Sequence, residues 1–470
     1  MFKPHVQDQG ELFPPRVGEL VPEDDLCRVV SEVVDRLDLS ALADNYSMLG
    51  QNAYSPRTML KLLFFGYARG VRSSRAIADA VHFDVRFRWL AGDDQPGKSA
   101  IADFRVRNLA AIEDLFVQVV LLCRRLGMIK FGNWAIDGTK LKASAGNNAH
   151  RSQRFIEQDL ARLREQIREA LAQAQQADDE DEDEPGLPPA IRRKQERVQR
   201  LERALETLQQ NPEQKRANTT DPDAPKMKRK GGGFEPSYNP QLTVDADSQV
   251  VLAADVCADH TDYTQLAPQL DQAESNAGRK PKEVSADTGY AGGPNLAEME
   301  RRGITGYIPP PEDGNKRKQG FKREDFRYEP EHDRFLCPAG KALPYHQTKT
   351  KSPATGTYKA RVYRCRQCSG CPLATDCLKK GAKTRSIEVS EHEGLIQAMR
   401  ERLSTDRGKQ AYARRKQSAE PVFGVAKWVM GFRSFLLRGL TKVRGEWRLD
   451  MLAFNIRKIW TSRKPKRQPA

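Results

Sequence analysis

The chain has 470 residues, with 78 Lys or Arg against 63 Asp or Glu and a formal net charge of +15 at pH 7. This length exceeds what one compact core usually organises, so we expect several globular parts. The basic excess favours a polyanionic partner, although a solubilising surface would carry the same charge. No stretch approaches the ~20 apolar residues of a membrane span and the start lacks a secretory signal, which predicts a cytosolic protein without membrane contact.

The first 128 residues are predicted to form an N-terminal helical domain. Helix start signals, in which Ser caps a helix or precedes a Pro at its first position, occur at Ser55 with Pro56, at Ser73 or Ser74, and at Ser99. The segment 73–89 has one apolar side and carries three arginines elsewhere: Arg75, Arg86 and Arg88. A DNA-binding module and an ordinary helical bundle both fit this pattern.

Residues 129–150 are predicted to begin an α/β core, because WAIDGTKLKA from Trp134 alternates as a strand does. Residues 151–233 interrupt this core. Leu and Ile recur at helical spacing from Ile156 to Leu171 and again from Ile191 to Leu208, with an acidic run between them. We expect an antiparallel helical hairpin without chemistry of its own, followed by a basic, glycine-rich linker.

The core is expected to resume over residues 234–311. NPQLTVDADSQVVLAADV predicts two antiparallel strands, and the predicted elements after it are a helix over 262–276, a strand over 283–291, a helix over 295–302 and a short strand at ITGYIP. This order predicts a mixed α/β layer. Residues 312–385 are expected to form a second, basic, cysteine-rich insertion, and residues 386–470 the helical end of the core with a basic tail.

Three acidic residues stand in contexts that suit chemistry. Asp137 and Asp287 each follow an apolar strand, where carboxylates make good ligands for hard cations, but each also fits an ordinary turn or helix cap. Glu420 lies among cations and would alone be read as a solvated ion-pair partner. On a continuous helix it shares a face with Lys416 and Lys427, whereas the following Pro421 predicts that the helix bends or begins there.

Five cysteines cluster in the second insertion. They are Cys337, Cys365, Cys368, Cys371 and Cys377, and their CxxC spacing in a reducing compartment predicts that four of the five bind a structural Zn²⁺. Such a site would hold together a loop too polar to bury its own core. Free thiols and an iron-sulfur cluster are the alternatives. Nearby cations suggest DNA contact: Arg361, Arg364, Arg366, Lys379 and Lys380.

Four motifs in order along the chain resemble a known family. They are IDGTKLKA around Asp137, YNPQLTVD with VVLAADV, SADTGY around Asp287, and RRKQSAEPVFGVAK around Glu420. With the helical first third, they resemble bacterial insertion-sequence transposases that have a ribonuclease-H-like catalytic domain, in the branch with a cysteine-bearing insertion. The resemblance implies a ribonuclease-H-like mixed sheet flanked by helices, in which these three acids form a metal-binding triad.

The resemblance also implies that Tyr412, Arg415 and Lys427 position DNA. The family pattern has three residues between its Arg and its Glu, whereas four separate Arg415 from Glu420 here, so Lys416 is a second candidate for that role. The implied cofactor is a pair of Mg²⁺ or Mn²⁺ ions about 3.5 to 4 Å apart. On this resemblance we expect Asp137 to bridge both ions, while Asp287 and Glu420 bind one each.

The implied reaction is cleavage at the ends of a mobile element and transfer of the freed 3′ hydroxyl ends to target DNA. The expected partners are double-stranded element ends and target DNA, with a homodimer formed on paired ends. Two alternatives stay open. One is a catalytically inactive, transposase-derived DNA-binding protein, and the other is a metal-dependent nuclease that cuts without joining, which the same carboxylates would serve.

Overall fold

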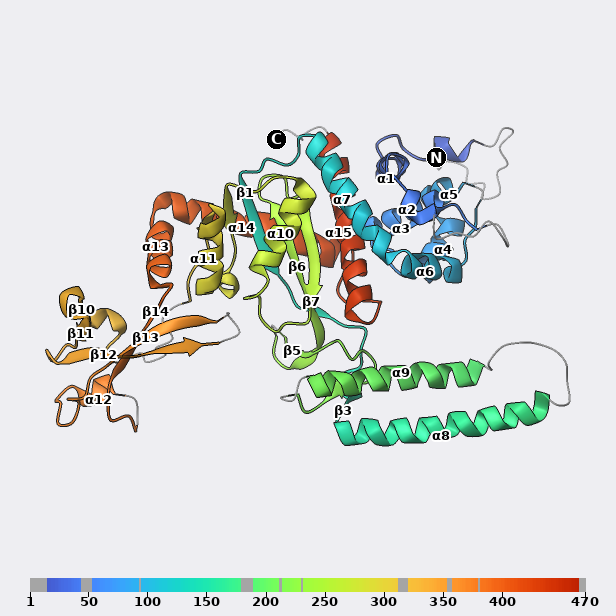
Figure 1. Cartoon of the computed structure of the whole chain (residues 1–470). Helices are drawn as coiled ribbons and strands as arrows, with labels where there is room; N and C mark the ends of the chain where they lie inside the picture. Colours follow the sequence, from blue (N-terminus) through green and yellow to red (C-terminus); the bar gives the residue numbers. More distant parts are fainter. Residues whose placement is uncertain are drawn as a thin grey trace, which may run out of the picture.

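The computed structural model describes residues 15–43, 53–92, 94–178, 189–210, 214–229, 231–311, 320–352, 357–378 and 381–464. Lys379, Lys380, most of the acidic run at 178–184 and the basic tail beyond 464 lie outside these ranges. A central sheet has the N-terminal helices on one side, a long helical hairpin beneath them and a small β-rich part at the opposite end (Figure 1).

The N-terminal part is helical, as predicted. Its helices are η1 (Val17–Leu20), α1 (Leu26–Asp35), α2 (Ser40–Ala43), α3 (Pro56–Arg69), α4 (Ser74–Phe83), α5 (Val85–Ala91), α6 (Lys98–Arg107) and α7 (Leu109–Arg125). Ser55 precedes the Pro at the start of α3, and the Ser73 hydroxyl caps α4 by accepting from the Ala76 N–H. Helix α6 begins at Lys98 after Gly97, one residue before the predicted Ser99 start.

The central sheet mixes parallel and antiparallel strands. Its strands are β1 (Asn133–Gly138), β2 (Leu141–Lys142), β5 (Lys226–Lys228), β6 (Phe234–Asp245), β7 (Val251–Cys257), β8 (Glu283–Ser285) and β9 (Thr305–Tyr307). The long β6 pairs antiparallel with β1 and β7, whereas β8 runs parallel to both β1 and β9. This mixed α/β arrangement is consistent with the ribonuclease-H-like fold that the resemblance implies.

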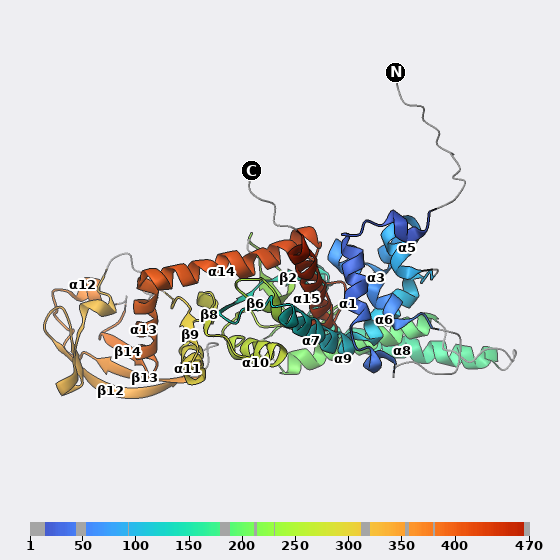
Figure 2. The same cartoon turned by 90° about the horizontal axis from the view of Figure 1, so that it is seen from above.

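Helices cover both faces of this sheet, which is why β1 and β7 are buried at nearly every position rather than at alternate ones. The covering helices are α10 (Leu266–Ala277), α11 (Gly293–Arg302), α13 (Glu393–Ser404), α14 (Asp406–Gly424) and α15 (Leu440–Arg463). Helix α14 passes along one side of the strands and α10 along the other (Figure 2). Two short helices complete this region: η3 (Thr288–Tyr290) and the π-helix η6 (Val425–Val429).

Pro421 lies inside α14, so the prediction that a helix begins there was wrong. Proline lacks the N–H that would bond to the carbonyl four residues earlier, which is that of Gln417. The Gln417 carbonyl instead accepts a hydrogen bond from the Gln249 side chain at 2.7 Å. The helix continues through Glu420, and a neighbouring loop satisfies the carbonyl that the proline leaves without its usual donor.

The first insertion is a pair of long helices, α8 (Gln153–Asp178) and α9 (Pro189–Gln210), as the Leu and Ile spacing predicts. Their apolar stripes meet in a small separate core that includes Ile156, Leu160, Leu201 and Leu208. At the base of the two helices, β3 (His150–Arg151) pairs with β4 (Ala217–Asn218). The short helix η2 (Asn147–Ala149) directly precedes β3.

The cysteine-rich part is an antiparallel sheet rather than a loop. It contains β10 (Arg327–Glu329), β11 (Arg334–Leu336), β12 (Ala342–Lys351), β13 (Tyr358–Arg364) and β14 (Ser386–Ser390), with η4 (Arg323–Asp325), η5 (Pro330–His332) and α12 (Ala374–Cys377). Phe335, Leu343, Tyr363 and Ile387 form its core. The expectation that this segment is too polar to bury a core was wrong, because β11 to β14 turn these few apolar side chains to one face. The sheet also continues past residue 385, our expected boundary.

Helix α15 joins the N-terminal helices to the sheet. It packs against α3 and α7 on one side and β7 on the other, within one hydrophobic cluster. Arg72 and Glu446 form a buried ion pair at 2.7 Å across this junction. In the described ranges, no helix is long and apolar enough to cross a membrane.

Candidate active site

Asp137 and Asp287 meet at one edge of the central sheet. Asp137 is the next-to-last residue of β1, and Asp287 lies just beyond the end of the parallel strand β8. Parallel strands bring their carboxyl ends to a common edge, which is where the fold gathers these side chains. Backbone N–H groups fix one oxygen of each carboxylate: Gly138 donates to Asp137 at 2.9 Å and Gly289 to Asp287 at 2.8 Å.

Burial destabilises the charged form of the carboxylates at this edge. Burial raises the pKa of Asp137 to about 6, with the charge of Asp287 adding to the effect and that of Arg415 opposing it. The pKa of Asp287 is raised by burial and by the nearby carboxylate of Asp262. An additional cation would stabilise the charged form of every carboxylate here.

Arg415 connects Asp137 to Glu420. Its guanidinium is 3.1 Å from an Asp137 oxygen and 3.5 Å from a Glu420 oxygen, and it lies 5.8 Å from the centre of the Tyr412 ring. Arg415 is buried, whereas Lys416 is exposed to solvent. The structure thus places Arg415 rather than Lys416 against the carboxylates, despite the extra residue before Glu420. The Glu420 carboxylate itself remains half exposed, at 52 % of its side chain.

Lys427 reaches the same edge from η6. Its ammonium donates a hydrogen bond to the Thr139 hydroxyl at 2.6 Å, two residues beyond Asp137. Helix α14 ends at Gly424, so the α-helical face predicted for Lys416, Glu420 and Lys427 does not continue to the last of them. The hydrogen bond to Thr139 nevertheless brings the Lys427 ammonium to the end of β1.

A further carboxylate, Asp262, was missed by sequence reasoning. One of its oxygens accepts hydrogen bonds at 2.7 Å from the side chains of both Asn239 and Gln241 on β6. A side-chain carbon on Gly289 would lie 2.8 Å from an Asp287 oxygen and 3.2 Å from an Asp262 oxygen, which shows how closely the two acids approach. Asp262 lies in the loop between β7 and α10, and only the path of this loop in the structure shows that its carboxylate is near Asp287. Our predicted helix began at residue 262, whereas α10 begins at Leu266.

Comparison with known families gives two matches. Residues 15–107 match the family described as transposase domain (DUF772), and residues 336–460 match the family described as transposase DDE domain. These matches identify the chain as an insertion-sequence DDE transposase. No curated protein matches it.

The two matched segments divide the site unequally. The DDE match contains Glu420 and its basic neighbours together with all five clustered cysteines, while Asp137 and Asp287 lie between the two segments. Membership of this family implies an enzyme of the transposase or nuclease kind that acts on DNA. The three acids predicted from the sequence therefore come from parts of the chain that are far apart.

The carboxylates suit a divalent cation by their chemistry. Carboxylate oxygens are the ligands that Mg²⁺ and Mn²⁺ prefer, and the raised pKa values of Asp137 and Asp287 show that their charge lacks full compensation. Among the residues that the structure describes, however, no group of three or more His, Cys, Asp or Glu is arranged to hold a metal ion. At the carboxylates, Arg415 fills the space between Asp137 and Glu420.

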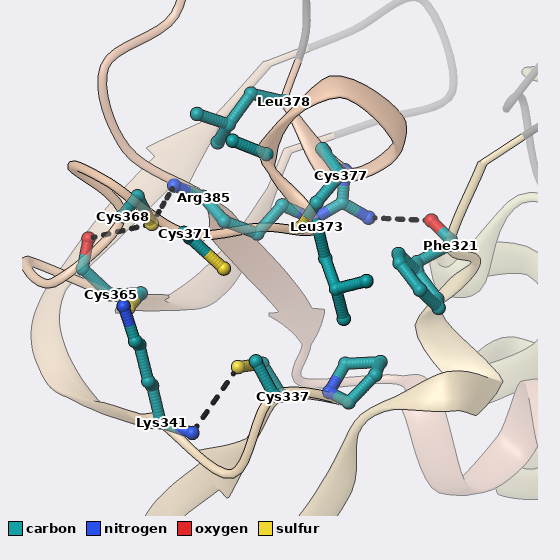
Figure 3. A pocket seen from close by; sticks show the side chains of 13 residues that line it. Phe321, Cys337, Lys341, Cys365, Cys368, Cys371, Leu373, Cys377, Leu378 and Arg385 are labelled. Atoms are coloured by element: carbon teal, nitrogen blue, oxygen red, sulfur yellow. Dashed lines mark hydrogen bonds between the residues drawn. The ribbon is translucent and has the colours of Figure 1, made fainter.

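The five cysteines of the transposase surround one small cavity of about 20 Å³ (Figure 3). Cys365 is buried in the core of the small sheet, and burial raises the pKa of its thiol to about 11. Backbone N–H groups point at two of the sulfurs: Lys341 donates to Cys337 at 3.3 Å and Arg385 to Cys368 at 3.4 Å. The cavity has room for a single ion and the donors suit Zn²⁺, although the sulfurs do not yet form a closed site.

Proposed function

We propose that this transposase cleaves the ends of a mobile element and joins the freed 3′ hydroxyl ends to target DNA, using Asp137, Asp287 and Glu420 to hold two divalent cations. The observation that carries the proposal is the meeting of Asp137 and Asp287 at the ends of two parallel strands, with Glu420 linked to Asp137 through Arg415. Two bound Mg²⁺ ions would activate the attacking oxygen and stabilise the leaving one.

The residues around the carboxylates have separate roles in this proposal. Hydrogen bonds from Gly138 and Gly289 fix the carboxylate orientations before a cation arrives. Arg415 offsets part of the negative charge of Asp137 and Glu420, so these acids are only partly compensated without a cation. Lys427, held over Thr139, presents an ammonium group to the DNA phosphate next to the site.

DNA placement is assigned in the same proposal. Tyr412 and Arg415 stack at the edge of the site, with exposed Lys416 beside them, and the N-terminal helices provide further duplex contacts. Arg75 and Arg88 on α4 and α5 are exposed, whereas Arg86 is ion-paired with Asp84 at 2.6 Å. Two chains acting on paired ends would form a homodimer.

The test uses purified protein, linear DNA carrying the element ends, and Mg²⁺ or Mn²⁺. We expect nicked and joined products that both disappear with Asp137→Asn, while DNA affinity is retained. The matched control is Asp247→Asn, since Asp247 is an exposed acid in the β6–β7 turn. Nicks without joining would support a nuclease instead, and DNA binding with no cleavage by the wild-type protein would support an inactive DNA-binding relative.

We also propose that four of the five clustered cysteines bind one structural Zn²⁺. The support is their convergence on one cavity and the backbone N–H groups directed at Cys337 and Cys368, which are the interactions that stabilise thiolate ligands. The raised pKa of Cys365 means that zinc binding would release protons. Zinc would add to the small core of this sheet rather than replace it.

A further inference from the structure

A groove of about 950 Å³ opens at the end of β1, the strand that carries Asp137. Gly138 and Thr139, the residues that follow Asp137, form part of its wall. Its other walls come from the end of β5 and the loop after it, from the start of β6, and from η6, which are remote from β1 in sequence. The groove, which we call the strand groove, therefore leads from the surface to the edge of the sheet where Asp137 lies.

The strand groove is strongly basic. Lys140, Lys228, Arg229 and Lys427 line it, and the first three are exposed to solvent. The only acid among its lining residues is Glu235, whose carboxylate is 3.1 Å from Arg229. Because the cations exceed the acid by three, the groove suits a ligand that carries several negative charges in a row.

Trp428 supplies a large aromatic surface in the same groove. Its residue is 71 % exposed, an unusual state for the largest apolar side chain, and it belongs to the π-helix η6. The Arg433 guanidinium lies 4.2 Å from the ring centre and holds the indole by a cation–π contact. A ring fixed in this way beside cations presents a flat surface to a planar ligand.

We propose that the strand groove binds one unpaired DNA strand running toward Asp137, with a base stacked on Trp428. A basic groove combined with an exposed aromatic ring is the arrangement that binds single-stranded nucleic acid, because phosphates meet cations while a free base face meets the ring. Bases inside a duplex are stacked on each other and offer no such face. This inference rests on the proposed function, and it assigns to Trp428, Lys228 and Arg229 a role in placing the strand that is cut or joined.

The experiment measures stacking without catalysis. A single-stranded oligonucleotide with 2-aminopurine near its 3′ end is titrated with the full chain in buffer without Mg²⁺ or Mn²⁺, so no strand is cut. We expect quenching of 2-aminopurine with the wild-type protein, an affinity about 5- to 100-fold weaker with Trp428→Ala, and near-normal binding with Trp428→Phe. Phe155→Ala is the matched control, since Phe155 is an exposed aromatic beneath Arg151 on the hairpin, away from the groove.

A second variant tests the cations independently of the ring. Replacing both Lys228 and Arg229 by Gln should reduce the salt dependence of binding, and the slope of log affinity against log salt should fall by about 0.7 for each phosphate that no longer meets a cation. Equal quenching by the wild-type protein and Trp428→Ala overturns the inference, as does tighter binding of an RNA strand of the same sequence.

Cleavage with Mg²⁺ is scored separately, so the two proposals can fail separately. If element ends are cut and joined while Trp428→Ala leaves the quenching unchanged, the strand groove is wrong and the proposed function stands. If quenching depends on Trp428 but no DNA is cut, the strand groove stands and the proposed function is wrong.

Discussion

Asp137 is placed where strand geometry, burial and charge act on the same carboxylate. The end of β1 fixes its position, the Gly138 N–H fixes one of its oxygens, and burial raises its pKa to about 6. Arg415 supplies the compensating charge at 3.1 Å. A carboxylate held in this way suits a cation, because a bound cation would stabilise its charged form against both burial and the repulsion from Asp287.

Asp262 is expected to tune the site. Asp262→Asn removes one negative charge near Asp287 and leaves an amide facing the Asn239 and Gln241 donors. We expect the Mg²⁺ concentration for half-maximal cleavage to rise about 10- to 100-fold, as for partners that support metal ligands. Asp259→Asn is the control, because Asp259 accepts from Thr264 and Gln265 on the outer side of the same loop. An unchanged Mg²⁺ requirement would show that Asp262 has only a structural role.

Sequence motifs predicted residues whose neighbours form a recognisable pattern, but they did not predict residues that only the fold brings to the site. Asp137, Asp287 and Glu420 stand within recognisable motifs, and the structure brings the first two together and links the third through Arg415. Asp262 stands in a loop without a pattern, and only the approach of that loop to β6 brings it to the site. Spacing favoured Lys416 as strongly as Arg415, because a sequence does not show which side of α14 is buried.

At the scale of single elements, α14 shows how a local rule is overridden. Pro421 lies inside this helix instead of starting it, and the Gln249 side chain satisfies the Gln417 carbonyl that the proline leaves without a backbone donor. Similarly, the small antiparallel sheet was unexpected because its apolar residues are few and widely spaced. Both results depend on contacts between segments that are distant in sequence, which local patterns do not contain.

Helix α15 carries a carboxyl group whose effect on stability depends on pH. Asp450 is fully buried beside the Arg72–Glu446 pair, and neither of its oxygens has a hydrogen-bond donor in the described part of the chain. Burial raises its pKa well above the usual value, with the charge of Glu446 adding to this and that of Arg72 opposing it. Folding therefore takes up a proton at Asp450, and the associated stability, complete below about pH 4, is lost as pH rises toward the folded pKa.

Asp450→Asn removes this titration while keeping the shape of the side chain. We expect the free energy of unfolding of the variant, relative to the wild type, to increase from pH 5 to pH 8 by up to about 1.4 kcal/mol per pH unit. Urea unfolding at both pH values measures the difference, and other titrating groups cancel in the comparison. A difference independent of pH would contradict the raised pKa of Asp450.

The small cysteine-rich sheet is expected to bind zinc. Metal analysis of the purified chain should find about one zinc per chain, and Cys368→Ser should lower it substantially because one of the converging thiols is removed. Cys257→Ser is the control, since Cys257 is buried at the end of β7 beside Asn239. Equal zinc content in wild type and Cys368→Ser would remove Cys368 from the site, and absence of zinc from the wild type would favour free thiols.

At the scale of the whole molecule, the chain combines a continuous core with basic surfaces. One hydrophobic cluster extends from the N-terminal helices through α15 into the sheet, although the sequence suggested a separate helical domain. The hairpin and the cysteine sheet each have their own small cores. The net charge of +15 was visible in the composition, but only the fold shows that Lys140, Lys228, Arg229 and Lys427 gather beside Asp137.

The central claim is that these distant acids share divalent cations, and crystals soaked in Mn²⁺ test it most directly. Anomalous diffraction should show Mn²⁺ bound by the carboxylates of Asp137 and Asp287, with a second ion at Glu420 when DNA is present and Arg415 turned away. The peak at Asp137 should vanish in Asp137→Asn crystals. Cleavage-competent protein whose Mn²⁺ ions bind elsewhere, away from Asp137 and Asp287, would contradict the account.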